Sequence, residues 1–114
     1  MKTKSFKKLE QEIIIAIGRH GYTLYTKIKD LENTDTKIYT KGVVDGCTVS
    51  VHRGDISSLT VSFSENYIQM TYSALIALTY DAEGQIQYVM IDHTGNTKYS
   101  AIFAEIKKLI ERGW

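Results

Sequence analysis

The stretch Ile38–Arg53, IYTKGVVDGCTVSVHR, decides the fold of this chain. Two runs in which apolar and polar residues alternate flank the dipeptide Asp45-Gly46. Alternation with a period of two is typical of half-buried strands, and Asp-Gly between two such runs is typical of a type I′ hairpin turn, because both central residues must adopt positive φ. The sequence therefore predicts an antiparallel hairpin that turns at these two residues.

The turn also predicts the register of the hairpin. Val44 would face Cys47, and on the same face Gly42 would meet Val49 and Thr40 would meet Val51. This apolar face is expected to lie in the core. The opposite, open face would then carry Tyr39, Lys41 and Val43 opposite His52, Ser50 and Thr48.

A second hairpin is predicted from register alone, with a turn at Glu65-Asn66. It pairs Ser64 with Tyr67 and collects the apolar residues on one face, as the pairs Phe63–Ile68, Val61–Met70 and Leu59–Tyr72. Ser62 with Gln69 and Thr60 with Thr71 would fill the other face. A slip of one residue would mix the two sets, so the pattern favours this turn.

Two further strands complete the predicted sheet. The first spans Tyr22–Leu31, and the last spans Gln85–Asp92 after a hairpin loop, Asp81–Gly84, that ends on a glycine in the left-handed region. Because the last strand is partly apolar on both faces, we expect it to be more central or more covered than the others.

Helical periodicity marks both ends of the chain. Apolar residues recur at helical spacing from Ser5 to Arg19, with Ser5 as a possible N-cap and Gly21 as the left-handed residue that ends the helix. A second apolar stripe follows a cap at Thr97 or Asn96 and ends at Gly113. Its members are Tyr99, Ile102, Phe103, Ile106, Leu109 and Ile110.

These elements predict a single α+β domain over residues 1–114. Its architecture is a two-layer antiparallel β-sheet meander of five to six strands, with an N-terminal and a C-terminal α-helix packed on one face. The other sheet face would stay open and carry Thr, Ser, Gln and Tyr. No linker or internal repeat divides the chain.

Composition narrows the class of protein. The chain has 114 residues, 43% of them hydrophobic and 24% charged, and its net charge is +1, so we expect neither disorder nor a protein that coats a polyanion. The basic N-terminus continues into Glu10, Gln11 and Glu12, which leaves no signal peptide or membrane span. With a single cysteine as well, the expected location is the cytoplasm, of a cell or of a phage-infected host.

The residues do not indicate catalysis. His20, His52 and His93 are scattered, and none has ligand spacing to another or to Cys47, so we predict no metal site and no cofactor. The predicted register places Cys47 in the core and His52 on the open face, which separates a possible nucleophilic pair. There is no glycine-rich phosphate loop and no pair of carboxylates on neighbouring strands. We therefore predict that the chain is not an enzyme.

The leading hypothesis is a small protein-interaction module that binds another protein through its open sheet face or an edge strand. Tyrosine, histidine and arginine are favoured at protein interfaces. The candidate partner-binding residues are Tyr39, Lys41, His52, Arg53, Tyr67, Gln69 and Thr71. A homodimer through a sheet edge or the open face is compatible with this hypothesis.

The sequence also suggests an origin for the protein and an alternative function. The composition is rich in Lys, Ile and Thr and lacks proline, which suits a phage or mobile-element protein that inhibits or regulates a host protein such as a defence-system component. The alternative function is nucleic-acid binding, through the Tyr/Lys sheet face or through the basic N-terminal end. The residues of that end are Lys2, Lys4, Lys7 and Lys8.

Overall fold

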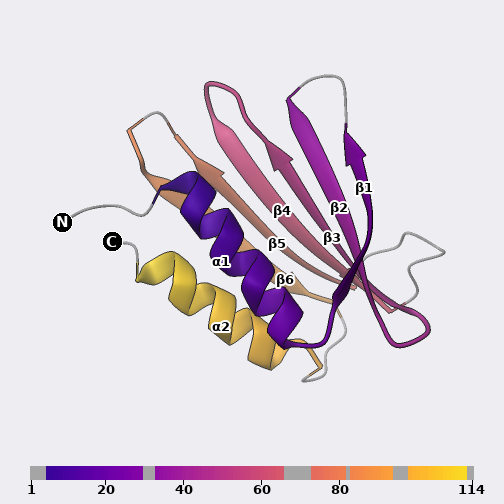
Figure 1. Cartoon of the computed structure of the whole chain (residues 1–114). Coiled ribbons are helices and arrows are strands. Elements are labelled where there is room, and N and C mark those ends of the chain that lie inside the picture. The colour runs from indigo at the N-terminus through magenta and orange to yellow at the C-terminus, as the bar shows by residue number, and fades with distance from the viewer. Residues whose placement is uncertain (1–4, 30–32, 66–72, 82, 94–97, 113–114) are drawn as a thin grey trace.

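A computed structural model describes residues 5–29, 33–65, 73–81, 83–93 and 98–112 of the chain. The elements in chain order are α1 (Phe6–Arg19), β1 (Thr23–Lys29), β2 (Thr34–Lys41), β3 (Asp45–His52), β4 (Ser57–Ser64), β5 (Ala74–Tyr80), β6 (Ile86–Asp92) and α2 (Ser100–Glu111). The six strands form one antiparallel sheet in which each strand pairs with its neighbours in sequence, in the order β1-β2-β3-β4-β5-β6 (Figure 1). The predicted α+β meander is confirmed.

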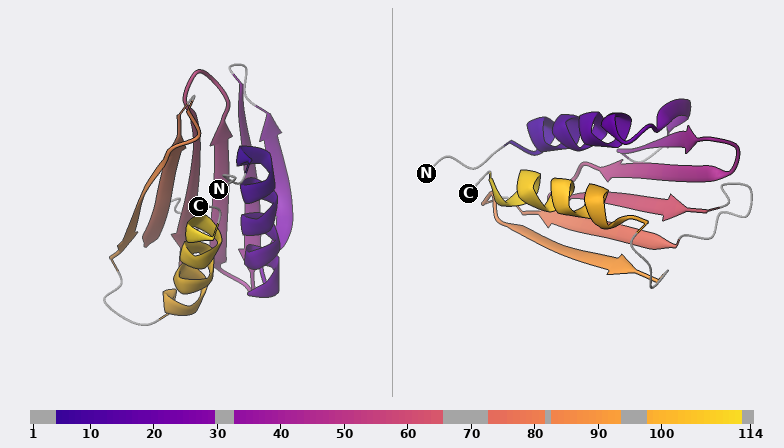
Figure 2. Two further views of the ribbon diagram at one scale, coloured as in Figure 1. Left: turned by 90° about the vertical axis from the view of Figure 1, so that its left-hand side faces the viewer. Right: turned by 90° about the horizontal axis from the view of Figure 1, so that it is seen from below.

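Both helices lie on the same face of this sheet, side by side (Figure 2). Their buried residues join the inward residues of β2–β5 in one hydrophobic core. The helices contribute Leu9, Ile13, Ala16, Ile17, Ile102, Ile106 and Ile110, and the strands contribute Tyr39, Cys47, Val49, Val51, Leu59, Val61, Phe63, Ala74, Ile76 and Leu78. Burial of this apolar surface is the main term that stabilises the two layers.

The ends of the helices agree in part with those predicted from the sequence. The Ser5 hydroxyl accepts a hydrogen bond from the Lys8 amide at 3.2 Å, which confirms the N-cap of α1, and Gly21 has the predicted positive φ, 93°. Helix α2, however, has Tyr99 at its N-cap, without a side-chain hydrogen bond. The prediction of a cap at Thr97 or Asn96, which lie outside the described residues, is therefore wrong, because α2 begins only at Ser100, next to the buried Tyr99.

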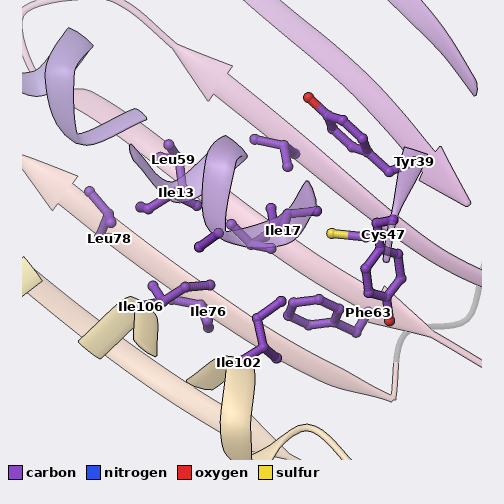
Figure 3. Close-up of a cluster of buried hydrophobic side chains, with 14 of the residues drawn as sticks. Ile13, Ile17, Tyr39, Cys47, Leu59, Phe63, Ile76, Leu78, Ile102 and Ile106 are labelled. Carbon is purple, nitrogen blue, oxygen red and sulfur yellow. The ribbon is translucent and has the colours of Figure 1, made fainter. Parts of the chain in front are cut away.

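An aromatic cluster closes the core at one end of the helices. The ring of Phe63, on β4, lies 5.1 Å from the ring of Tyr99 and 5.9 Å from those of Tyr22 and Phe103, measured between centroids. Figure 3 shows Phe63 and Cys47 beside the inward-facing residues of both helices. Aromatic pairs at such distances add to the stabilisation that burial alone provides.

The turn between β2 and β3 differs from the prediction. It spans Gly42–Val44, with φ of 65° at Gly42, while Asp45 and Gly46 belong to β3. As a result, Tyr39 pairs with Cys47. This register buries the large tyrosine ring, whereas the predicted one would bury Thr40 and Gly42 in its place, and an aromatic side chain removes far more apolar area from water.

The register of the next hairpin also differs. Val61 pairs with Ile76 instead of Met70, and Leu59 pairs with Leu78 instead of Tyr72. The predicted turn at Glu65-Asn66 and the strand from Tyr67 run into residues 66–72, which lie outside the described residues. The inward face of β4 is nevertheless as predicted.

The last hairpin is confirmed at its loop, where Gly84 has φ of 82°. The expectation that the last strand is central or well covered is wrong, because β6 is an edge strand. Its outward residues Val89 and Ile91 are 49% and 36% exposed. Ile86 and Met90 on its inner face pack against the core, so only the apolar character of its outward face is not explained by burial among the described residues.

Candidate interaction surface

The face of the sheet that points away from the helices is built from alternate residues of every strand, and we call it the open face. The registers define it, because residues that pair across strands point to the same side. Its members are Thr23, Thr26 and Ile28 in β1; Thr34, Thr36, Ile38 and Thr40 in β2; Gly46, Thr48, Ser50 and His52 in β3; Ser58, Thr60, Ser62 and Ser64 in β4; Leu75, Ala77 and Thr79 in β5; and Gln87, Val89 and Ile91 in β6.

None of these described strand residues is Asp, Glu, Lys or Arg, although such residues make up 24% of the chain. The centre of the open face consists of serine and threonine hydroxyls, and its margins carry aliphatic side chains such as Ile28, 52% exposed, and Val89, 49% exposed. A sheet face that only meets water usually alternates with charged residues, whereas the centre of a protein interface is depleted of them. In its lack of charged residues the open face therefore resembles the centre of an interface.

Hydroxyl groups on the open face are organised across strands. The Thr36 hydroxyl lies 3.3 Å from that of Ser50, and the Thr34 hydroxyl lies 3.0 Å from Nδ1 of His52. These cross-strand contacts restrict the rotamers of the short side chains and so preorganise the surface. Such a surface loses little conformational entropy when a partner covers it.

Two candidate residues do not lie on this face, contrary to the prediction. Tyr39 points toward the helices and is only 6% exposed, because it pairs with Cys47. Lys41 follows on the same side of β2, where its ammonium lies 5.6 Å from the ring centroid of Tyr22. Both placements follow from the turn at Gly42–Val44, which reverses the two faces of β2 relative to the predicted register.

Arg53 also belongs to the helix side. Its guanidinium donates to the Glu10 carboxylate of α1 at 2.8 Å and to the Asp35 carboxylate of β2 at 3.0 Å. The Glu10 side chain is 9% exposed, so this cation neutralises a nearly buried charge and links α1 to the sheet. The contacts of Arg53 are thus structural, and they separate it from His52, which is exposed on the open face as predicted.

The remaining candidates are divided between described and undescribed segments. Tyr67, Gln69 and Thr71 lie outside the described residues, as do Lys2 and Lys4. Lys7 and Lys8 are exposed in the first turns of α1. The Tyr/Lys sheet face of the nucleic-acid alternative is not formed by Tyr39 and Lys41, because both point to the helix side.

Cys47 and His52 lie on opposite faces of β3, as predicted. Cys47 is 1% exposed within the core, and burial raises the pKa of its thiol, which disfavours the nucleophilic thiolate. Within the described part of the chain, no three His, Cys, Asp or Glu side chains are grouped so that they could hold a metal ion.

A cluster of ionisable groups lies where the end of α1 meets α2, a feature that the sequence spacing does not reveal. Glu105 accepts hydrogen bonds from Arg19 at 2.7 Å, and its other oxygen lies 2.8 Å from Nε2 of His20. They line a shallow groove of about 450 Å³ together with Lys108 and Arg112. The cluster links the two helices across the surface of the layer.

The Glu105 contacts predict a pH-dependent contribution to stability. The hydrogen bonds from Arg19 and, to a lesser extent, His20 lower the pKa of the Glu105 carboxyl, so its contribution is present above the ordinary glutamate pKa and is lost as pH falls through the lowered value. Because the Arg19 side chain is 56% exposed, solvent screening limits the loss in Glu105→Gln to about 1 kcal/mol at pH 7. Urea unfolding of both proteins should show this difference at pH 7 and none near pH 2; a constant difference would contradict the assignment.

Comparisons of this chain with protein-family models, with curated proteins and with solved structures found no significant match. In the described part of the chain, neither helix is long and apolar enough to cross a membrane.

Proposed function

We propose that this chain is a non-enzymatic interaction module that binds another protein through the open face of its sheet. The observation that carries the proposal is the absence of Asp, Glu, Lys and Arg from the described strand residues of that face. Exposed Ile28, Val89 and Ile91 frame a centre of Ser and Thr hydroxyls. Aliphatic side chains provide the favourable burial, and hydroxyls can bond either to water or to a partner.

The size of the face suits a stable complex. Six strands at a spacing of about 4.8 Å, each with seven or eight residues at about 3.3 Å, cover roughly 700 Å². A standard interface buries about 800 Å² on each partner. The partner that fits is a protein surface that is uncharged at its centre, with aliphatic groups over the two margins and hydrogen-bonding groups over the middle.

A module of this kind can inhibit or regulate its partner by covering a functional surface. The lysine-, isoleucine- and threonine-rich composition without proline supports an origin in a phage or mobile element, with a host defence protein in the host cytoplasm as the target class. The nucleic-acid alternative through the open face is less well supported, because the described strand residues of that face include no lysine or arginine to contact phosphates. The alternative through the basic N-terminal end, which includes the exposed Lys7 and Lys8, does not depend on this face.

A charge placed at the centre of the open face should abolish partner binding. Ser62 on β4 pairs with Thr48 on one side and Leu75 on the other, and its side chain is half-buried by these neighbours. Ser62→Lys would place an ammonium under any protein that covers the face, and it should weaken binding at least about 100-fold. Pull-down from the native host followed by calorimetry with the purified partner measures this effect.

The matched control is Ile15→Lys, at a residue of α1 that is 56% exposed on the helix layer. It adds the same charge away from the open face and should leave the affinity unchanged. Equal binding by Ser62→Lys and wild type would exclude the open face as the binding surface. Loss of binding in both Ser62→Lys and Ile15→Lys would show that the added net charge, and not its position, weakens binding. Binding that survives in Ser62→Lys but falls steeply with salt would favour nucleic acid.

A further inference from the structure

The two edges of the sheet are protected to very different degrees. Strand β1, at one edge, has a bulge at Tyr25, where the register shifts, and its sequence contains Lys27 and Lys29. Bulges and lysines on an edge strand are the devices by which proteins prevent a further strand from pairing there. Figure 2 shows β1 and β6 at opposite margins of the sheet.

Strand β6, at the other edge, has none of these devices. Its sequence, IQYVMID, contains no lysine, arginine or proline, and its register with β5 is continuous from Ile86 to Asp92. The side chains of Tyr88, Val89 and Ile91 are between 36% and 49% exposed. A long, regular and apolar edge of this kind is a template for pairing with another strand.

The backbone alternation identifies the groups that this edge offers. The His93 amide donates to the Ser73 carbonyl at 2.8 Å, so the amides of the odd-numbered residues of β6 face β5. The amides and carbonyls of Tyr88 and Met90 therefore point away from β5, along the outer edge of the sheet. They have the spacing that an incoming antiparallel strand requires.

We propose that a second copy of this chain occupies this edge, with the two β6 strands antiparallel about a two-fold axis perpendicular to the sheet. That axis places the helices of both copies on the same side and continues both apolar rows of β6 across the junction. Asp92 is the only Asp, Glu, Lys or Arg in the strand, and antiparallel pairing moves the two copies of it to opposite ends. Strand β1 is less suited to self-pairing, because its bulge at Tyr25 interrupts the regular edge and Lys27 and Lys29 would have to be accommodated in the junction.

The dimer goes beyond the proposed function and does not depend on it. Pairing at β6 leaves Ser62 and the centre of the open face uncovered, and it joins two open faces into one surface twice as wide. Each dimer would therefore present two equivalent sites to partners. The variants that test the two proposals lie in different strands, so either proposal can fail alone.

The test is sedimentation velocity of the purified chain from about 1 to 200 µM, a range suited to an edge contact of modest area. Wild type should convert from monomer to dimer within this range. Val89→Lys, which sets two ammonium groups close to the axis, should weaken the dimer at least about tenfold. Ile28→Lys is the matched control, since Ile28 lies on the same open face with 52% exposure against 49% for Val89, but at the β1 edge.

Dimerisation of Ile28→Lys as in wild type, together with weakened Val89→Lys, supports the proposal. Val89→Thr keeps a β-branched side chain without charge and should remain dimeric, and circular dichroism checks that each variant is folded. A wild-type monomer throughout the range overturns the proposal, as does an unaffected Val89→Lys. Equal weakening by both lysine variants also overturns it, because that result indicates face-to-face packing of two open faces.

Discussion

Replacing Phe63 by alanine should lower the free energy of unfolding by about 3–5 kcal/mol, the loss typical of a buried phenylalanine. Phe63 is fully buried, and its ring lies within 6 Å of the rings of Tyr22, Tyr99 and Phe103. Tyr22 lies between α1 and β1, and Tyr99 and Phe103 belong to α2 and its N-cap. A cavity at Phe63 is therefore bordered by separate parts of the fold and cannot close by a local shift. Urea unfolding should show a lower midpoint with an unchanged slope.

The control for this prediction is Val43→Ala in the β2–β3 turn. Val43 is 87% exposed, and its truncation should change the free energy of unfolding by less than about 0.5 kcal/mol. A loss below about 1 kcal/mol in Phe63→Ala would contradict the close packing of the aromatic cluster, since even the transfer of the ring to water costs more than that.

The sequence predicts the layers of this fold well because their signals are local and repeated. The apolar stripe from Leu9 to Ile17 has one helical interpretation, and burial of each of its predicted core positions agrees with it. The alternation in β3 and β4 is equally clear, with Val49 and Val61 in the core and Ser50 and Ser62 on the open face. Two amphipathic helices and a one-sided sheet can bury their apolar faces only against each other.

Pairing registers are harder to predict from the sequence than the layers. Two predicted registers are wrong, and the two errors have different consequences. The pairing of β4 with β5 is displaced from the prediction by an even number of residues, so Phe63 keeps its inward face although its partner is Ala74. The pairing of β2 with β3 is displaced by an odd number, which reverses β2 and takes Tyr39 into the core. A strand period of two makes the parity of the displacement decisive.

The sequence of β2 does not by itself indicate which of its faces is buried. In TDTKIYTK, one face carries Thr and Ile and the other carries Asp, Lys and Tyr, so neither is clearly apolar. The choice then depends on what lies above the strand, and Tyr39 finds a place next to Cys47 and beneath α1. This ambiguity affects the candidate site. The predicted positions of Tyr39 and Lys41 depend on the register of β2 and are wrong, whereas the position of His52 depends on the clear alternation of β3 and is correct.

The position of the edge strand β6 in the sheet is also not predicted by its sequence pattern. Its two apolar faces predict burial, and the structure places it at the margin, next to one strand only. Local pattern reports how much apolar area a strand carries and not which molecule covers it. The exposed apolar residues on this edge strand are the observation on which the proposed second copy depends.

Native Cys47 should react with a maleimide or with Ellman's reagent at least about 1,000-fold more slowly than the same thiol in the unfolded chain. The side chain is 1% exposed and lies between its partners on β2 and β4, and Figure 3 shows its sulfur directed into the core near Ile17. Burial also raises the pKa of the thiol, so the reactive thiolate is scarce until the core opens.

The control is the double variant Cys47→Ala, Val43→Cys, which carries a single thiol in the exposed turn. It should react nearly as fast when folded as in denaturant, because Val43 is 87% exposed. Rapid stoichiometric labelling of Cys47 in the folded wild type would contradict its burial and would indicate a reactive thiol.

The two predictions are coupled, because Cys47 on β3 pairs with Phe63 on β4. If labelling requires unfolding of the whole sheet, Phe63→Ala should accelerate it by the factor that corresponds to the lost free energy, about two to four powers of ten for 3–5 kcal/mol. If the acceleration exceeds the change measured by urea, the extra opening is local to these two strands. Since Cys47 lies on the central strand β3, beneath the helix layer, agreement of the two measurements would show that the helices and the central strands unfold as one unit.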